Sequence, residues 1–163
     1  FAMTLTLSAP RLFCARAFVA GSWIPAADGR TSAVVNPSTR EEIGRVPRLG
    51  AAETQRAITA AAAAFPAWCR RPAHERSEIL RKWAGLMLSH REDLARLMTL
   101  EQGKPLAESR GEIGYAASFL EWFAEEARRQ GYHVVGVGVI GMASANAAEL
   151  AQRAVVPSLM AEV

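Results

Sequence analysis

The segment from Thr99 to Arg129 constrains the fold of this chain more than any other stretch. A helix is predicted to end at Gly103, residues 103–105 turn the chain, and the next helix carries Glu108 and Glu112 in its early turns. Carboxylates there stabilise the positive end of the helix dipole. Apolar residues then recur at steps of three and four, which indicates one continuous apolar side. These residues are Ile113, Ala116, Leu120, Phe123 and Ala127.

The same helix carries a second apolar stripe, formed by Tyr115, Phe119 and Trp122. A helix that packs on one side only needs a single stripe, so two stripes are more than a surface helix requires. We therefore expect this helix to be covered on two sides. In a chain of 163 residues, the second cover is expected to come from another domain or another subunit.

Three helices are predicted upstream, over residues 51–65, 72–90 and 91–102, with Pro66 closing the first. Before them, apolar runs around Gly21 predict a β-hairpin within residues 12–24, and short strands are expected at 34–35 and 43–46. Residues 1–11 are expected to form a loose leader. The Ala- and Gly-rich residues 131–163 change in character and look like a truncated β-turn-α unit. The predicted fold class is α/β and rich in helices.

Composition and charge exclude several classes of function. The net charge is +3, and the 19 basic residues are dispersed among 16 acidic ones, so no basic stripe indicates nucleic-acid binding. No apolar run is long enough to predict a membrane span. Cys14 and Cys69 lack paired spacing, which favours free thiols in a cytoplasmic setting. The three histidines share no ligand spacing with other residues, so no metal site is predicted.

Two carboxylates flank the predicted turn, and paired carboxylates can perform acid–base chemistry. We interpret Glu101 and Glu108 instead as residues at helix ends that complement the dipoles. Lys104 in the turn is expected to be solvated. The four tryptophans are interpreted as packing anchors, because no basic residues interleave with them in a groove that would stack bases.

Residues 12–129 resemble the aldehyde dehydrogenase superfamily. The similarity is densest in Met98-Thr-Leu-Glu-Gln-Gly-Lys-Pro-Leu-Ala-Glu108 and in the run from Gly111 to Glu126, which look most like bacterial succinate-semialdehyde dehydrogenases. It extends back through Asn36-Pro37 to Val19-Ala-Gly-Ser-Trp23. The resemblance implies the N-terminal part of a much longer enzyme that oxidises an aldehyde to an acid with NAD or NADP. It also implies a cysteine nucleophile, a glutamate that activates water and a cofactor-binding lysine.

The motifs that carry those roles in the family are absent from this sequence, which has no Pro-Trp-Asn and no Gly-Gly-Lys segment. Cys14 and Cys69 fall upstream of where the family places its nucleophile. We therefore predict no catalytic residue in this chain and expect it to be inactive alone. A second hypothesis is a non-catalytic module that associates with itself or with a full-length homologue through its apolar helix faces.

The tail admits three interpretations. It resembles a divergent copy of the strand and helix that open the family's nucleotide domain. Alternatively, Gly136, Gly138 and Gly141 form a dinucleotide fingerprint, with Glu162 as an acidic ribose partner, which makes the three glycines candidate cofactor-binding residues. The third interpretation is a Gly- and Ala-rich tail that binds no ligand, and we place it ahead of the fingerprint because glycines are frequent in such runs. The predicted divisions are a leader over residues 1–11, the aldehyde dehydrogenase-like segment over 12–130 and the tail over 131–163.

Overall fold

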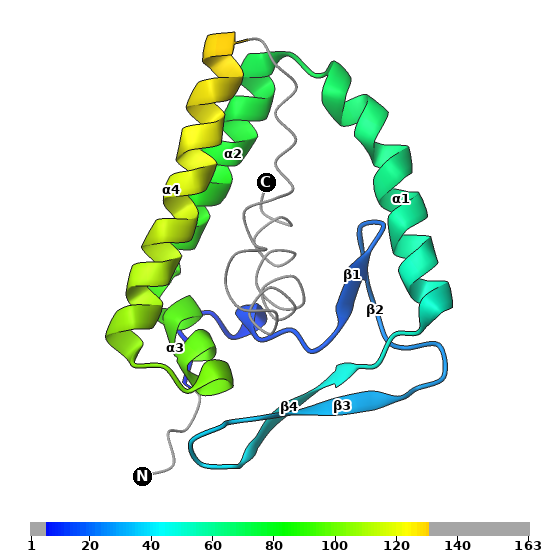
Figure 1. Ribbon diagram of the computed structural model, residues 1–163, viewed down its shortest axis with the longest axis vertical. Coiled ribbons are helices and arrows are strands. Elements are labelled where there is room, and N and C mark those ends of the chain that lie inside the picture. Colours follow the sequence, from blue (N-terminus) through cyan, green and yellow to red (C-terminus); the bar gives the residue numbers. More distant parts are fainter. Residues whose placement is uncertain (1–5, 131–163) are drawn as a thin grey trace.

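The computed structural model describes residues 6–130, with side chains up to Arg128. It contains four long helices and two small antiparallel sheets (Figure 1). The elements are η1 (Pro10–Leu12), β1 (Ala17–Val19), β2 (Ser22–Ile24), β3 (Thr31–Val35), β4 (Glu42–Pro47), α1 (Ala51–Arg70), α2 (Ala73–Ser89), α3 (Arg91–Gln102) and α4 (Leu106–Gln130). In Figure 1, α2 and α4 run side by side along one edge, while α1 stands apart on the other. The helix-rich fold class is confirmed.

Two hairpins precede the helices. Strand β1 pairs with β2 through a two-residue turn in which Ala20 and Gly21 have φ of 52° and 80°. Two successive positive φ angles match the twist of the flanking strands, so the predicted hairpin is confirmed. Strands β3 and β4 are longer than predicted and pair with each other, with an irregularity between Val34 and Val35. Asn36 closes their turn by accepting the Ser38 N–H at 2.9 Å.

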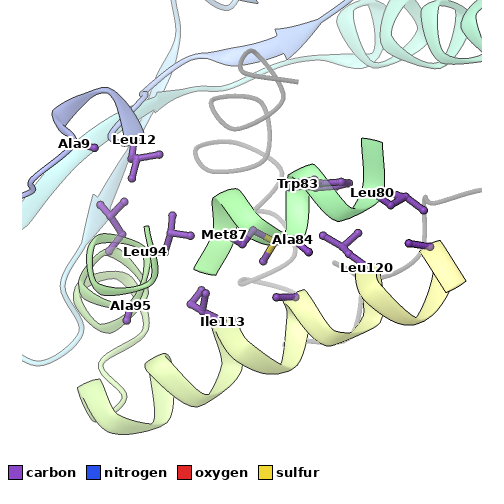
Figure 2. Close-up of a cluster of buried hydrophobic side chains, with 13 residues drawn as sticks. Ala9, Leu12, Leu80, Trp83, Ala84, Met87, Leu94, Ala95, Ile113 and Leu120 are labelled. Atoms are coloured by element: carbon purple, nitrogen blue, oxygen red, sulfur yellow. The ribbon is translucent and has the colours of Figure 1, made fainter. Parts of the chain in front are cut away.

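The hydrophobic core lies between α2, α3 and α4 (Figure 2). Small residues on α4, of which Ala117 and Ala124 are at most 1% exposed, allow α2 to approach closely. Larger side chains from α2 and α3 fill the space between the axes. The principal core residues are Leu80, Trp83, Ala84, Met87, Leu94, Leu97, Ile113, Ala117, Leu120 and Ala124. This side of α4 corresponds to the first apolar stripe predicted from the sequence. It differs at two positions, because Ala117 and Ala124 are buried where Ala116 and Phe123 were predicted.

The described part of the leader is docked rather than loose, so that expectation was wrong. Ala9 and Leu12 belong to the core cluster, and Leu12 is fully buried. The buried carboxylate of Asp93 accepts the Ser8 N–H at 3.0 Å and the Ala9 N–H at 2.8 Å. Because the two partners are more than 80 residues apart in sequence, no local pattern could reveal this clamp.

Helix α1 continues to Arg70, whereas Pro66 was expected to end it at Phe65. A proline inside a helix removes one hydrogen bond to the carbonyl four residues earlier. Residues 61–67 are all exposed, so water can bond the freed carbonyl and lower the cost of the break. Beyond the proline, the Cys69 carbonyl accepts Arg76 Nη1 at 3.0 Å, which stabilises the end of α1.

The turn between α3 and α4 is fixed by a glycine, as the sequence predicted. Gly103 has φ of 75°, the left-handed conformation that closes many helices, and its N–H bonds the Thr99 carbonyl at 2.8 Å. A Cβ at Gly103 would lie 2.8 Å from Cγ of Pro37, in the β3–β4 turn. The second hairpin therefore rests directly on this corner of the helical core.

Replacing Gly103 with alanine is expected to destabilise the fold by about 1–3 kcal/mol, because the new methyl group meets Pro37 and the left-handed backbone disfavours it. Gly85→Ala in α2 is the matched control, since a Cβ there meets open space. That variant should gain about 0.5–1 kcal/mol through helix propensity. Urea unfolding of both variants measures the difference, and equal effects would contradict the proposed contact.

Replacing Asp93 with alanine is expected to cost about 2 kcal/mol, because the buried Ala9 N–H and the partly buried Ser8 N–H lose a charged acceptor. Cleavage of the chain near residues 6–12 by a dilute protease should accelerate at the same time. Asp28→Ala is the control, since this exposed carboxylate bonds Arg30, two residues away, and no other residue of the described part of the chain. Unchanged protease sensitivity in the Asp93 variant would show that the leader is held by other contacts.

Candidate functional site

The candidate cofactor-binding glycines, Gly136, Gly138 and Gly141, lie outside the described residues. The same is true of Glu162 and of the whole predicted tail, residues 131–163. The three interpretations of this segment therefore stay predictions. The site must be sought in the helical core and at its corners, within residues 6–130.

The α3–α4 corner gathers several polar residues. Lys104 Nζ pairs with a carboxylate oxygen of Glu112, and its side chain is only 21% exposed, so the expectation of a solvated lysine was wrong. Thr99 Oγ1 and Ser109 Oγ lie 2.8 Å apart, and Ser109 is fully buried. These contacts join the last turn of α3 to the first turns of α4. Because these polar side chains bond one another, they favour a structural role for the corner over a ligand-binding role.

The two carboxylates beside the corner differ in environment. Glu108 lies in the first turn of α4, where its charge suits the dipole as expected. Glu101 lies in the last turn of α3, at the negative end of that dipole, so the dipole interpretation was wrong for this residue. Desolvation raises the pKa of Glu101 to about 7. Perturbed carboxyls often mark acid–base sites. Here burial is the single cause and no donor among the described residues bonds the carboxylate, which indicates a cost of packing.

Glu53 holds the base of α1 in place. Its Oε2 accepts the Gly50 N–H at 3.0 Å, which closes the first turn of the helix. Its Oε1 accepts the Ala27 N–H at 3.0 Å, which ties the loop after β2 to the same helix. The bond from Ala27 is the largest cause of the lowered pKa of Glu53, and the N–H groups of Glu53 and Gly50 add to it. A glutamate at the third position of a helix was the one sequence signal for this clamp.

Nucleophile and metal-ligand candidates are sparse in the described part of the chain. Cys14 and Cys69 are both free and half-buried, and the contact found for Cys69 involves its backbone carbonyl rather than its thiol. His90 sits between α2 and α3, with its Nε2 3.3 Å from Arg11 Nη2. Among residues 6–130, no three His, Cys, Asp or Glu side chains are grouped closely enough to hold a metal ion. The helices resolved there are also too short or too polar to cross a membrane.

The second stripe of α4 is uncovered by the described residues. Tyr115 is 62% exposed and Trp122 is 60% exposed, while Phe119 is half-buried. The rings of Tyr115 and Phe119 meet edge to face, with centroids 4.7 Å apart. Trp83 is a buried packing anchor as predicted, but Trp122 packs into no core formed by residues 6–130. The structure therefore presents, at Tyr115 and Trp122, the exposed part of the second apolar stripe that the sequence predicted beside the first.

The raised pKa of Glu101 predicts a specific pH dependence of stability. Between the ordinary value of 4.5 and about 7, the unfolded chain loses this proton before the folded chain does. Stability therefore falls as pH rises through this range, by up to about 3 kcal/mol from this group. Glu101→Gln should be more stable than the parent at pH 8 and equally stable at pH 4. Chemical unfolding at both pH values measures this, with Glu121→Gln on the exposed side of α4 as control. The same stability difference at both pH values would contradict the assignment.

Comparison with known proteins identifies the family. The sequence profile described as "Aldehyde dehydrogenase family" matches residues 23–154. The chain is 58% identical over 125 residues to glutarate-semialdehyde dehydrogenase of Pseudomonas aeruginosa, covering 77% of this chain and 26% of that enzyme. Identity is 54%, with the same coverage, to 3-sulfolactaldehyde dehydrogenase of Pseudomonas putida and to the NADP⁺-dependent succinate-semialdehyde dehydrogenase of Escherichia coli.

Solved structures agree with these matches. An NADP-dependent enzyme of Escherichia coli superposes with a TM-score of 0.73 at 55% identity, over 74% of this chain and 25% of that chain. A variant of betaine aldehyde dehydrogenase from Staphylococcus aureus, in complex with NAD⁺, superposes with a TM-score of 0.67 at 33% identity, over 70% and 23%. The chain thus spans about a quarter of the length of the curated relatives it matches. It belongs to the aldehyde dehydrogenase family.

Proposed function

We propose that this chain supplies the N-terminal part of an NAD(P)-dependent dehydrogenase that oxidises a semialdehyde to the acid. The similarity to three curated dehydrogenases, at 54–58% identity, is the observation that carries the proposal. Their names specify glutarate semialdehyde, succinate semialdehyde and 3-sulfolactaldehyde. All three substrates are short aldehydes with an anionic group at the far end. A short aldehyde with a distal carboxylate or sulfonate is therefore the proposed substrate class.

The matched region does not select among these substrates. The three relatives act on different aldehydes, yet their identities to this chain lie within a few per cent of one another. The region that matches the family includes the β3–β4 hairpin and the α2–α4 core, which set the shape of the fold. The succinate-semialdehyde specificity suggested by the sequence is thus one member of the proposed class, and the choice between NAD and NADP stays open in the same way.

We further propose that the chain alone is not catalytic. The family chemistry requires an activated cysteine, and a thiol becomes a good nucleophile when a base or a positive field lowers its pKa. Cys14 and Cys69 are half-buried thiols in the scaffold. The described residues would instead position the domain that completes the enzyme. The two free cysteines also support the proposal of a cytoplasmic location.

A second candidate function is a non-catalytic interaction module. The exposed Tyr115 and Trp122 favour it, because large aromatic side chains gathered on one helix face often mark an interaction surface. Such a module would associate with a second copy or with a full-length homologue. Light scattering of the purified chain distinguishes association from a monomeric state.

The purified chain is expected to reduce neither NAD nor NADP with succinate or glutarate semialdehyde, as measured by nicotinamide absorbance. A chimera in which residues 6–130 replace the matching region of the Pseudomonas aeruginosa enzyme is expected to oxidise glutarate semialdehyde. Replacing Cys14 and Cys69 with serine should leave the chimera's kcat within about twofold, because neither thiol is assigned to the chemistry. Turnover by the isolated chain that disappears in Cys69→Ser would overturn the proposal.

A further inference from the structure

Residues 6–11 of the leader are held by side chains from α3 and from the junction between α2 and α3. The bonds join the Ser8 and Ala9 N–H groups to Asp93, Arg96 Nη1 to the Thr6 carbonyl at 2.9 Å, and Arg11 to His90. These contacts are together called the leader clasp. Figure 2 shows Ala9 on the same side of the core cluster as Leu94 of α3. The clasp therefore connects a short N-terminal segment to residues 90–96 and to the core beneath them.

The contact between Arg11 and His90 can form in one protonation state only. A guanidinium group carries N–H donors and no acceptor, so Arg11 Nη2 must be the donor across the 3.3 Å to His90 Nε2. His90 Nε2 must then accept, which requires a neutral imidazole with its proton on Nδ1. A second proton on the ring would replace the accepting lone pair with an N–H group and would bring two cations to this distance. The contact is therefore sensitive to the charge of His90.

The carboxylates that follow His90 in the chain are engaged with other partners. Glu92 accepts two bonds of 2.8 Å from Arg110, and Asp93 accepts the N–H groups of the leader. The last four residues of α2, residues 86–89, are uncharged. The charged groups that contact His90, follow it in α3 or bond to those neighbours are Arg11, Arg91, Glu92, Asp93 and Arg110. A proton on His90 would therefore add a cation beside arginines, while both neighbouring carboxylates already bond other groups.

Histidine is the residue type that changes charge between about pH 5 and 8. We propose that His90 makes the leader clasp a pH-sensitive device, which closes on a neutral imidazole and loosens when the ring takes up a proton. The open clasp binds this proton more readily than the closed clasp, so opening of the leader becomes more favourable as pH falls. Opening withdraws Ala9 from the core cluster and exposes the surface of α3 around Asp93.

Acidification acts on the whole fold with the opposite sign. Burial raises the pKa of Glu101 to about 7, so this group makes the folded chain more stable as pH falls towards its ordinary value of 4.5. The leader should therefore loosen over a pH range in which the core gains stability from Glu101. General unfolding by acid would weaken both together, so the two responses can be separated in one titration.

Hydrogen exchange of the full 163-residue chain tests the device. The readout is the protection factor of the Ser8 and Ala9 amides at about pH 7.5 and about pH 5.5, normalised to the exchange rate of an unstructured chain at each pH. Acidification is expected to lower this protection about three- to fivefold, since an exposed hydrogen bond is replaced by repulsion between two cations. The amide of Leu120, in the core, should keep or gain protection over the same range. Equal losses of protection at Leu120 and at the leader amides would overturn the proposal.

Two substitutions should remove the pH response by different routes. His90→Gln keeps a neutral acceptor that does not take up a proton, and Arg11→Met removes the cation that a protonated ring would meet. Each variant should show the same leader protection at both pH values, within about 1.5-fold. His74→Gln is the matched control, because His74 is exposed on α2 away from the clasp, and it should retain the full response.

A response that persists in His90→Gln would assign the proton to another group, such as Asp93, and would overturn the proposal. A response that disappears in His90→Gln but persists in Arg11→Met would also overturn it, because His90 would then act through a contact other than Arg11. Leader protection that is the same at both pH values in the parent chain would reject the device outright.

Discussion

The close contact between α2 and α4 is the interaction on which the rest of the described fold depends. Ala117 and Ala124 have small side chains, so α2 can approach α4 closely. Leu80, Trp83 and Met87 of α2 belong to the same buried cluster. Helix α3 then closes the end of the pair with Leu94, and Ala9 of the leader joins the same cluster together with Leu12, which follows the leader. Without this contact, neither the leader nor the corner at Gly103 would have a surface to rest on.

Exposed polar contacts between α3 and α4 orient these helices but add little to the stability of the core. Arg110 binds Glu92 through two parallel bonds of 2.8 Å, and Arg91 Nε donates to the Arg110 carbonyl at 2.9 Å. Both contacts join α3 to α4 at an exposed surface, where ion pairs contribute little free energy. These bonds fix the angle between α3 and α4. The left-handed backbone of Gly103 allows this angle, and the proximity of Pro37 limits it. The core supplies the stability, and these bonds select one geometry for it.

The sequence predicted the features whose causes are local. Gly103 ends α3 because a glycine readily adopts a left-handed φ, and the bounds of α3 were predicted to the residue. The stripes of α4 followed from a period of 3.6 residues. Errors arose where distant residues decide the outcome. Asp93 binds a leader more than 80 positions away, Pro66 is tolerated because its surroundings are exposed, and Glu101 acquires its raised pKa from burial alone. The family resemblance came from motif density, whereas the candidate glycines fall in a segment that the structure does not describe.

The distribution of side-chain size on α4 links fold to function. Its internal contact uses mainly alanine, which contributes little apolar area, while its external side carries Tyr115 and Trp122. A helix that stabilised only this region would be expected to have the opposite arrangement, with aromatic rings inside, because they bury the most surface. Small residues suffice on the side of α4 that faces α2, because close approach of the two helices requires small side chains there. Within residues 6–130, most of the surface of Tyr115 and Trp122 stays exposed, so the stability of this region rests on the smaller side chains that α4 packs against α2 and α3.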